Sequence, residues 1–437
     1  MSRTLRLLIG LTLFTLSALD PALAQEARSR WERMAQIRRD KFDHVLPDAM
    51  RENGIDMWIT VVREGLYDPL FEDLGRGYVG DIGYYIFTDR GGDRIERAAL
   101  GIDGYLLERN GAYDLFGSAD LRQFVAERDP KRIGVNMSRS IGAADGLSHS
   151  SFERLVEILG QPYATRMVSA ERLISAFRSR RVATEIVAFA EAGELSRQIA
   201  ERALSNEVIV PGVTALEDVA WWMMDELLSR GLDTSFDFPS VYITGPEGIL
   251  ATSSERIIQR GDLLMIDWGV GYLNLYTDMK RIGYVLRAGE TAVPAGIQNA
   301  FEQGLRVREI IRKTISAGPT AGEMLDRLNA EIAAAGFEIM KQFNVVSGGP
   351  MTEVMIGCHS VGNLGHGIGP SIAAFNPLRM TFEIKPSNLF SIELFAWTAA
   401  PEWGGAKVRI PLEDDAIVTE RGVEWLYPVN QRILLIR

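Results

Sequence analysis

Hydrophobic and polar positions in the first part of the chain switch between the period of a helix and the period of a strand. Apolar residues at spacings of three and four predict a helix over residues 30–53, and Gly54 ends it. Strand-like runs follow it at residues 57–62, 83–88, 95–100 and 132–135. A turn at residues 90–93 predicts that the second and third runs form a hairpin. This alternation predicts a small α/β domain.

The pattern changes near residue 180, where a long helix is predicted to begin. A basic segment at residues 173–181 leads into a long helix with one apolar face, so we place a domain boundary near residue 180. The chain is therefore expected to be an α+β protein of two domains. The smaller covers residues 25–180 and the larger covers residues 181–437.

Two aspartates accompany strand-like runs in the larger domain. Residues 263–267 form an apolar run that ends in Asp267, as in a strand buried on both faces. Residues 272–279 alternate, which places Asp278 on the polar face of a second strand. A turn at residues 269–271 would make the strands antiparallel, so that both carboxylates face one point.

Two glutamates and a histidine extend this set. Residues 390–397 alternate around Glu393, and a later turn returns the chain toward Glu413. Residues 364–370 read Leu-Gly-His-Gly-Ile-Gly-Pro, and the glycines beside His366 would let the backbone approach a bound ion closely.

These five side chains have the chemistry of a two-metal centre. Hard or borderline divalent ions prefer carboxylate oxygens with an imidazole, and a pair of ions needs bridging carboxylates. Four carboxylates would balance two such ions and leave room for a bridging hydroxide, which is a nucleophile at neutral pH. The ordered set therefore predicts a metal-dependent hydrolase.

From Arg178 onward the sequence resembles the catalytic domain of the pita-bread metallopeptidases, the family of aminopeptidase P, prolidase, methionine aminopeptidase and creatinase. Residues 30–180 are similar, more loosely, to the creatinase-type N-terminal domain. The motifs that carry the resemblance are Ile266-Asp267-Trp268-Gly269, Thr277-Asp278-Met279-Lys280-Arg281, Gly365-His366-Gly367-Ile368-Gly369, Phe390-Ser391-Ile392-Glu393 and the run from Glu413 to Thr419.

The resemblance implies roles for all five residues. Asp278, His366 and Glu413 would hold one metal ion. Asp267 and Glu413 would hold the other, with Asp278 bridging, and Glu393 would bind metal and transfer protons. The family further implies a homodimer that hydrolyses short peptides, with Xaa-Pro bonds as candidates, by a metal-bridging hydroxide. We expect two divalent ions, with Mn favoured by the oxygen-rich ligands and Zn, Co or Fe as alternatives.

Two regions depart from the family pattern. Active members usually carry a substrate-facing histidine before the first aspartate strand and another after the Gly-His-Gly motif, but residues 245–254 and 372–377 contain none. His44 and His149 lie in the N-terminal domain, which leaves His359 as the spare imidazole near the motif. His359 could act in catalysis or simply make a structural hydrogen bond. A pita-bread-fold binding protein that retains metal, with weak or no catalysis, is therefore an alternative.

Two other chemistries fit the sequence poorly. Cys358 stands where a nucleophile elbow would need its first glycine, before His359-Ser360-Val361-Gly362. Asn274 replaces the third glycine of a dinucleotide motif, and no helix pattern follows it.

Composition and the N-terminus bear on location and partners. The 437 residues are 46% hydrophobic and carry a formal net charge of −11, which argues against nucleic acid as a partner. Residues 1–24 combine two arginines, an apolar stretch and Ala22-Leu23-Ala24, which predicts a cleaved signal peptide. We expect a periplasmic or secreted protein without a membrane anchor after cleavage. Cys358 is the only cysteine, so no intrachain disulfide can form.

Overall fold

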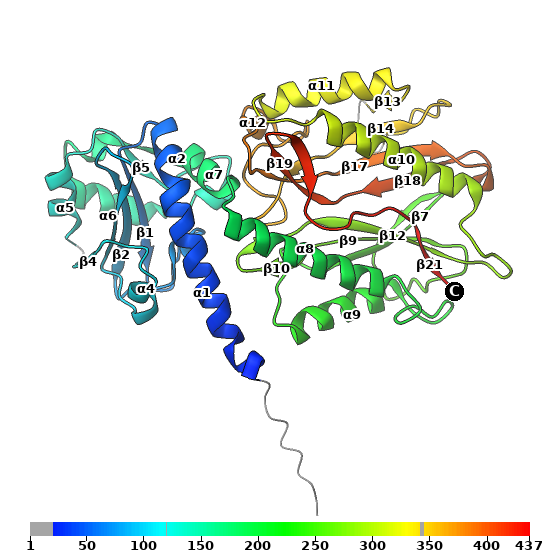
Figure 1. Ribbon diagram of the computed structural model, residues 1–437, viewed down its shortest axis with the longest axis horizontal. Coiled ribbons are helices and arrows are strands. Elements are labelled where there is room, and N and C mark those ends of the chain that lie inside the picture. Colours follow the sequence, from blue (N-terminus) through cyan, green and yellow to red (C-terminus); the bar gives the residue numbers. More distant parts are fainter. Residues whose placement is uncertain (1–20, 119, 341–344) are drawn as a thin grey trace, which may run out of the picture.

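The computed structural model describes residues 21–118, 120–340 and 345–437. The expected signal peptide lies outside them except for residues 21–24, which begin helix α1 (Pro21–His44). Within the described residues, no helix is both long enough and apolar enough to cross a membrane. The chain forms a smaller and a larger body, with α1 running along the smaller one (Figure 1).

The smaller body is a mixed sheet with helices on both faces, in the order β4-β3-β2-β1-β5-β6. Its strands are β1 (Met57–Arg63), β2 (Ile82–Asp89), β3 (Ile95–Leu100), β4 (Leu115–Gly117), β5 (Ile133–Val135) and β6 (Met167–Ser169). Its further helices are α2 (Leu46–Glu52), α3 (Phe71–Leu74), α4 (Tyr105–Arg109), α5 (Leu121–Arg128), α6 (His149–Leu159) and α7 (Glu171–Ser179). The predicted hairpin is β2–β3.

Strand alternation gives this sheet two apolar faces. Trp58 and Phe87 pack on one side with Phe177 of α7, whereas Ile59 and Ile86 pack on the other with α5 and α6. The helix expected over residues 30–53 is in fact two helices, α1 and α2. Pro47 lies in the first turn of α2, where its missing N–H does no harm, but it could not continue α1.

The larger body consists of small sheets enclosed by helices. Its sheets are ordered β21-β12-β9-β7-β8, β13-β14-β17-β18, β15-β16-β19-β20 and β10-β11. The strands are β7 (Ser240–Gly245), β8 (Gly248–Leu250), β9 (Leu263–Trp268), β10 (Gly271–Tyr272), β11 (Leu275–Tyr276), β12 (Met279–Val285), β13 (Glu338–Ile339), β14 (Glu353–Ile356), β15 (His359–Ser360), β16 (Leu389–Ser391), β17 (Leu394–Ala399), β18 (Lys407–Leu412), β19 (Asp415–Thr419), β20 (Gly422–Trp425) and β21 (Leu434–Ile436).

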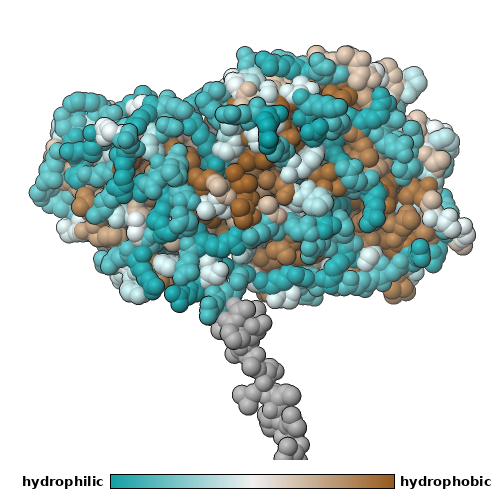
Figure 2. Space-filling model, viewed as in Figure 1, coloured by the Kyte–Doolittle hydropathy of each residue, from teal (hydrophilic) through white to brown (hydrophobic). Residues whose placement is uncertain are grey.

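Helices cover these sheets on opposite sides (Figure 1). Helices α8 (Ala183–Ala203) and α9 (Leu216–Ser229) pack against the outer face of β9, where Ile266 and Trp268 are buried. The helices on the other side are α10 (Ala295–Thr314), α11 (Ala321–Ala334) and the short α12 (Pro377–Met380). On the face in Figure 2, hydrophilic residues cover most of the smaller body, and hydrophobic residues gather over the larger one. The whole is the expected α+β, two-domain architecture.

One expected turn lies elsewhere. The hairpin before Asp278 turns at Leu273 and Asn274, which have φ values of 52° and 59°, and not at residues 269–271. Two successive left-handed residues suit the right-handed twist of a two-residue hairpin. Gly269 instead allows a close approach, because a Cβ there would lie 1.7 Å from the carbonyl oxygen of Thr277.

A buried ion-pair chain joins the two bodies near the expected boundary at residue 180. Lys41 of α1 lies 3.2 Å from Glu185 of α8, and Glu185 also pairs with Arg181 at 2.8 Å. Arg181 in turn donates to the side-chain oxygen of Asn363 at 2.7 Å, on the loop that carries His366. The N-terminal body therefore helps to position a loop of the larger one.

We predict a pH-dependent stability from Asp68, a buried carboxyl that accepts hydrogen bonds from the Leu70 N–H and from Asn136. Burial raises its pKa from 3.8 to about 6, so its contribution to stability is full below its unfolded pKa and is lost as pH rises through about 6. Urea unfolding of Asp68→Asn, compared with the unchanged chain, should shift in favour of the variant by up to roughly 3 kcal/mol between about pH 4 and pH 7.5.

The control for this prediction is Asp81→Asn. Asp81 is exposed, and its hydrogen-bonded pair with Arg154 lowers its pKa, so its stability change falls in the acid range below pH 4. A difference between Asp68→Asn and the unchanged chain that is independent of pH would contradict the prediction.

Candidate metal centre

The strand pair β9–β12 brings the two aspartates together. These strands are antiparallel, with Asp267 opposite Lys280 and Trp268 opposite Met279. Asp278 directly precedes β12, and its backbone N–H donates to Asp415 Oδ2 at 3.2 Å. Carboxylate oxygens of Asp267, Asp278 and Glu413 lie within 4.8 Å of one another. The expected convergence of the aspartates is therefore present, although the turn that produces it is a different one.

Both glutamates lie where the chain leaves one sheet for another. Glu393 falls between β16 and β17, so the continuous strand expected over residues 390–397 is wrong. The carbonyl oxygen of Glu393 accepts the Gly357 N–H at 3.0 Å, and a Cβ on Gly357 would lie 2.3 Å from Glu393 Oε2. Glu413 falls between β18 and β19, and the Ser391 hydroxyl donates to its carboxylate. Because neither glutamate lies within a strand, the alternating directions of strand side chains do not fix where its carboxylate points.

Two histidines complete the cluster. His359 in β15 lies opposite Ser391 of β16 and is buried. Its Nε2 lies 3.4 Å from Glu413 Oε1 and 3.8 Å from Asp278 Oδ2, yet no described residue makes a hydrogen bond of good geometry with it. The ring of His366 stands edge-on to it, 4.7 Å away between centroids. Asp278, His359 and His366 can each offer one atom within 4.8 Å of the others.

The structure thus brings all five expected ligands together and adds His359. An orphaned imidazole nitrogen that faces two carboxylates is the environment that a divalent ion would satisfy, so the donor set fits a metal. His366 is exposed and Asp267 is partly exposed, which leaves a route for an ion or a ligand.

The glycines around His366 let the backbone of this loop pack closely against Ser360 on one side and against Asp278 of the cluster on the other. A Cβ on Gly367 would lie 3.0 Å from Ser360, and one on Gly369 would lie 2.6 Å from the Ser360 hydroxyl. Gly365 faces Asp278 Oδ2, at 3.3 Å from an added Cβ. The loop is also held by Ser175 of α7, which donates to the Ile368 carbonyl at 2.6 Å.

Lys280 is the site residue that the sequence analysis missed. Its ammonium nitrogen lies 2.7 Å from Glu393 Oε1 and 3.1 Å from Asp267 Oδ2, and it also hydrogen-bonds Glu413. The signal was present in the sequence, because residues two apart in a strand share a face and Asp278 was already placed toward the cluster.

The charges of the cluster perturb one another strongly. Burial raises the pKa of Asp267, and burial with the nearby Glu413 raises that of Asp278 well above its usual value. Burial would also raise the pKa of Glu413, but Lys280 and His359 lower it to about 2. Burial alone would lower the pKa of Lys280, whereas the surrounding carboxylates raise it well above its usual range.

The two imidazoles respond in opposite directions. Burial disfavours the charged form of His359, but Glu413 outweighs this effect and raises its pKa. Desolvation and the neighbouring His359 lower the pKa of His366 to about 4, even though part of its ring is exposed. His366 is therefore neutral at pH 7 and keeps a nitrogen lone pair for an ion.

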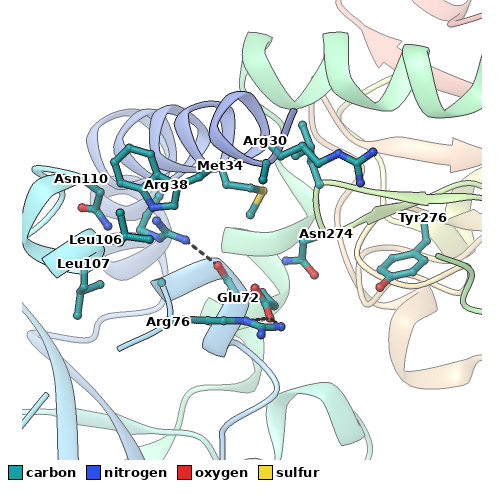
Figure 3. Close-up of a pocket in the computed structure, with 14 residues that line it drawn as sticks. Arg30, Met34, Arg38, Glu72, Arg76, Leu106, Leu107, Asn110, Asn274 and Tyr276 are labelled. Carbon is teal, nitrogen blue, oxygen red and sulfur yellow. Dashed lines mark hydrogen bonds and ion pairs between the residues drawn. The ribbon is translucent and has the colours of Figure 1, made fainter. Parts of the chain in front are cut away.

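A cavity of about 640 Å³ is lined in part by residues that lie close to Asp278 along the chain, but it does not contain the ligand cluster. Arg30, Met34 and Arg38 of α1 line one side, and Asn274 and Tyr276 of the β10–β11 hairpin line another (Figure 3). None of the candidate metal ligands is among the residues that line this cavity.

Comparisons with known proteins agree with this geometry. The family model described as metallopeptidase family M24 matches residues 188–420. A sequence comparison with curated proteins gave no match.

Solved structures share the fold over nearly the whole chain. An X-Pro aminopeptidase from Thermotoga maritima is 18% identical with a TM-score of 0.63, and the match covers 89% of this chain and 99% of that one. An Xaa-Pro dipeptidase from Bacillus anthracis is 19% identical, with a TM-score of 0.60 and coverage of 94% and 99%. A prolidase from Pyrococcus horikoshii is 16% identical, with a TM-score of 0.58 and coverage of 93% and 100%.

We predict that Gly369→Ala disturbs the His366 loop. The added Cβ would lie 2.6 Å from the Ser360 hydroxyl and 2.7 Å from Ser179 Cβ, so the loop or β15 must shift. Overpacking of this kind should lower the free energy of unfolding by about 1–3 kcal/mol and reduce the metal retained after dialysis. Gly142→Ala is the control, since an added Cβ there meets nothing within 4 Å. Equal stability and metal content in the two variants would refute the prediction.

Proposed function

The chain belongs to metallopeptidase family M24, and from this membership we propose that it is a metal-dependent peptidase that hydrolyses short peptides. The observation that carries the proposal is the convergence of Asp267, Asp278, Glu393 and Glu413 with two imidazoles in one cluster. Hydrolysis of an amide needs a polarised carbonyl, an activated water and a group that moves protons. A bound divalent ion would supply the first two, because it polarises a carbonyl oxygen and lowers the pKa of water.

Glu393 is the candidate proton carrier. Burial raises the pKa of its carboxyl, which brings proton uptake closer to neutral pH. Its Oε1 accepts from Lys280, and its Oε2 faces Gly357, where the missing side chain leaves room. Lys280 thereby fixes the orientation of Glu393 while leaving the second oxygen free to take up and return a proton.

Arg409 offers a place for the polar end of a peptide. Its Nε and Nη1 atoms are buried and find no hydrogen-bond partner among the described residues, and its guanidinium lies 4.4 Å over the Phe395 ring. The same ring lies 5.6 Å from the Lys280 ammonium, so Arg409 borders the cluster. A peptide carbonyl or carboxylate would satisfy these donors. The Xaa-Pro enzymes that share the fold support Xaa-Pro bonds as the first substrates to try.

We propose Mn as the first ion to test, because four of the expected ligands are carboxylates. Export to the periplasm or beyond rests on residues 1–24, and a homodimer rests on the family resemblance alone.

A peptide-binding protein without hydrolysis is the second candidate function. Two observations favour it: residues 245–254 and 372–377 contain no histidine, and a lysine lies among the carboxylates. A panel of dipeptides and tripeptides, incubated with Mn, Zn or Co and read by mass spectrometry, separates the two functions. Cleavage of any peptide supports the peptidase. Binding without product under every condition supports the second candidate.

We predict that Glu393→Gln abolishes most of the peptide hydrolysis. Glutamine keeps the size of the side chain but cannot carry the proton, and loss of a general acid–base should lower kcat by about 10²- to 10⁴-fold. Glu353→Gln is the matched control, because Glu353 is also buried and paired with a lysine, Lys407, but lies outside the cluster. Hydrolysis rates measured at saturating metal would refute the role of Glu393 if both variants kept equal activity.

A further inference from the structure

The ammonium group of Lys280 lies where a cation of the cluster would be expected. It contacts three of the four carboxylates that were assigned to metal ions, namely Asp267, Glu393 and Glu413. A buried positive charge surrounded by three carboxylates does the electrostatic work of a bound cation.

The backbone pairing of β12 fixes the direction of the Lys280 side chain. Lys280 is paired with Asp267 across the β9–β12 ladder, and its N–H donates to the Glu413 carbonyl at 3.1 Å. Arg281, the next residue, points to the opposite face and binds Asp414 at 2.8 Å. The side chain of Lys280 is only 5% exposed, so its charge lies inside the protein.

Lys280 divides the possible ligand groups into two kinds. In the group of Asp267, Asp278 and Glu413, and in the group of His359, Glu393 and Glu413, two of the three members are already paired with the ammonium. The third group consists of Asp278, His359 and His366. None of these three residues forms an ion pair with Lys280 in the described part of the chain.

We propose that Lys280 permanently takes the place of one of the two expected cations, so that the centre binds a single divalent ion on Asp278, His359 and His366. This inference rests on the proposed metal dependence but not on hydrolysis. It differs from the two-ion centre that the family resemblance implies.

Charge and ligand chemistry agree with a single ion. Four carboxylates carry four negative charges, and one divalent ion with one ammonium carries three positive charges, so the two sums differ by one. The buried His359 lies beside Glu413 with its Nε2 unpartnered among the described residues. Two imidazoles and one carboxylate form a ligand set of the kind that holds Zn²⁺ or Fe²⁺ with positions left open. The partly exposed His366 gives the ion a way in.

Metal stoichiometry tests the proposal directly. The full chain is stripped with chelator, loaded with Mn²⁺ or Zn²⁺, and weighed by native mass spectrometry. We expect one ion per chain in the unchanged protein. Lys280→Met removes the ammonium and nearly keeps the length of the side chain, so the freed carboxylates should bind a second ion.

A control variant and a spectroscopic measurement complete the test. Lys407→Met removes a second buried lysine, paired with Glu353 outside the cluster, and should leave one ion per chain. Mn²⁺ electron paramagnetic resonance of the unchanged protein should show an isolated ion and no exchange-coupled pair, whether or not Lys280→Met folds. Two ions or a coupled pair in the unchanged protein would overturn the proposal, as would no ion at all or a single ion in a folded Lys280→Met.

Removal of His359 identifies the ligand set. His359→Ala should weaken Zn²⁺ binding by more than about tenfold. Loss of a residue that only hydrogen-bonds to a metal ligand already costs about that much affinity, so loss of a ligand itself should cost more. His149→Ala, at an exposed position on α6, should leave affinity unchanged. Equal affinities would exclude His359 as a ligand. Absence of peptide cleavage with one ion bound would contradict only the proposed function, whereas cleavage with two ions bound would contradict only this inference.

Discussion

The larger body depends on neutralising the negative charge that its strands bring together. One cluster contains Asp267, Asp278, Glu393 and Glu413. The buried Asp415 accepts a hydrogen bond from the backbone N–H of Asp278. Each buried carboxylate disfavours the charge on its neighbours, by desolvation and by repulsion. The protein resolves this with unequal environments: cationic side chains surround Glu413 and lower its pKa, whereas burial raises the pKa of Asp278 and Asp415.

Strand β12 supplies cations to two faces at once. Lys280 points toward Glu413, and Arg281 points away toward Asp414, which also binds Arg308 of α10 at 3.1 Å. The adjacent carboxylates of the β18–β19 connection therefore both find partners, one in the candidate metal centre and one in the core. The alternation of a strand thus ties the candidate metal centre to the core that holds it.

Local patterns predicted much of this arrangement. The apolar run that ends in Asp267 and the glycines around His366 are short-range signals, and both residues lie in the cluster as expected. Glu393 was placed in a continuous strand because alternation carries no mark of a change of sheet. The left-handed turn at Leu273 and Asn274 was also missed, since leucine is rare in that conformation.

The spacing from Asp278 indicated which face Lys280 would take, but not that its ammonium would be buried among carboxylates, because a lysine within a strand usually faces solvent. Its importance depends on contacts with residues more than 100 positions away, such as Glu393 and Glu413, which only the folded chain reveals.

An internal ammonium and an exchangeable ion differ in one physical respect. Stabilisation of the folded state by a metal ion depends on its free concentration and vanishes when that falls well below the dissociation constant, whereas a covalently attached cation is present at any metal supply. Lys280 therefore keeps the carboxylates of Asp267, Glu393 and Glu413 compatible with folding before any metal arrives. The same ammonium lacks open coordination positions and cannot polarise a carbonyl as a divalent ion does. Under the single-ion proposal, an ion on Asp278, His359 and His366 would polarise the carbonyl, and Glu393, held by Lys280, would carry the proton.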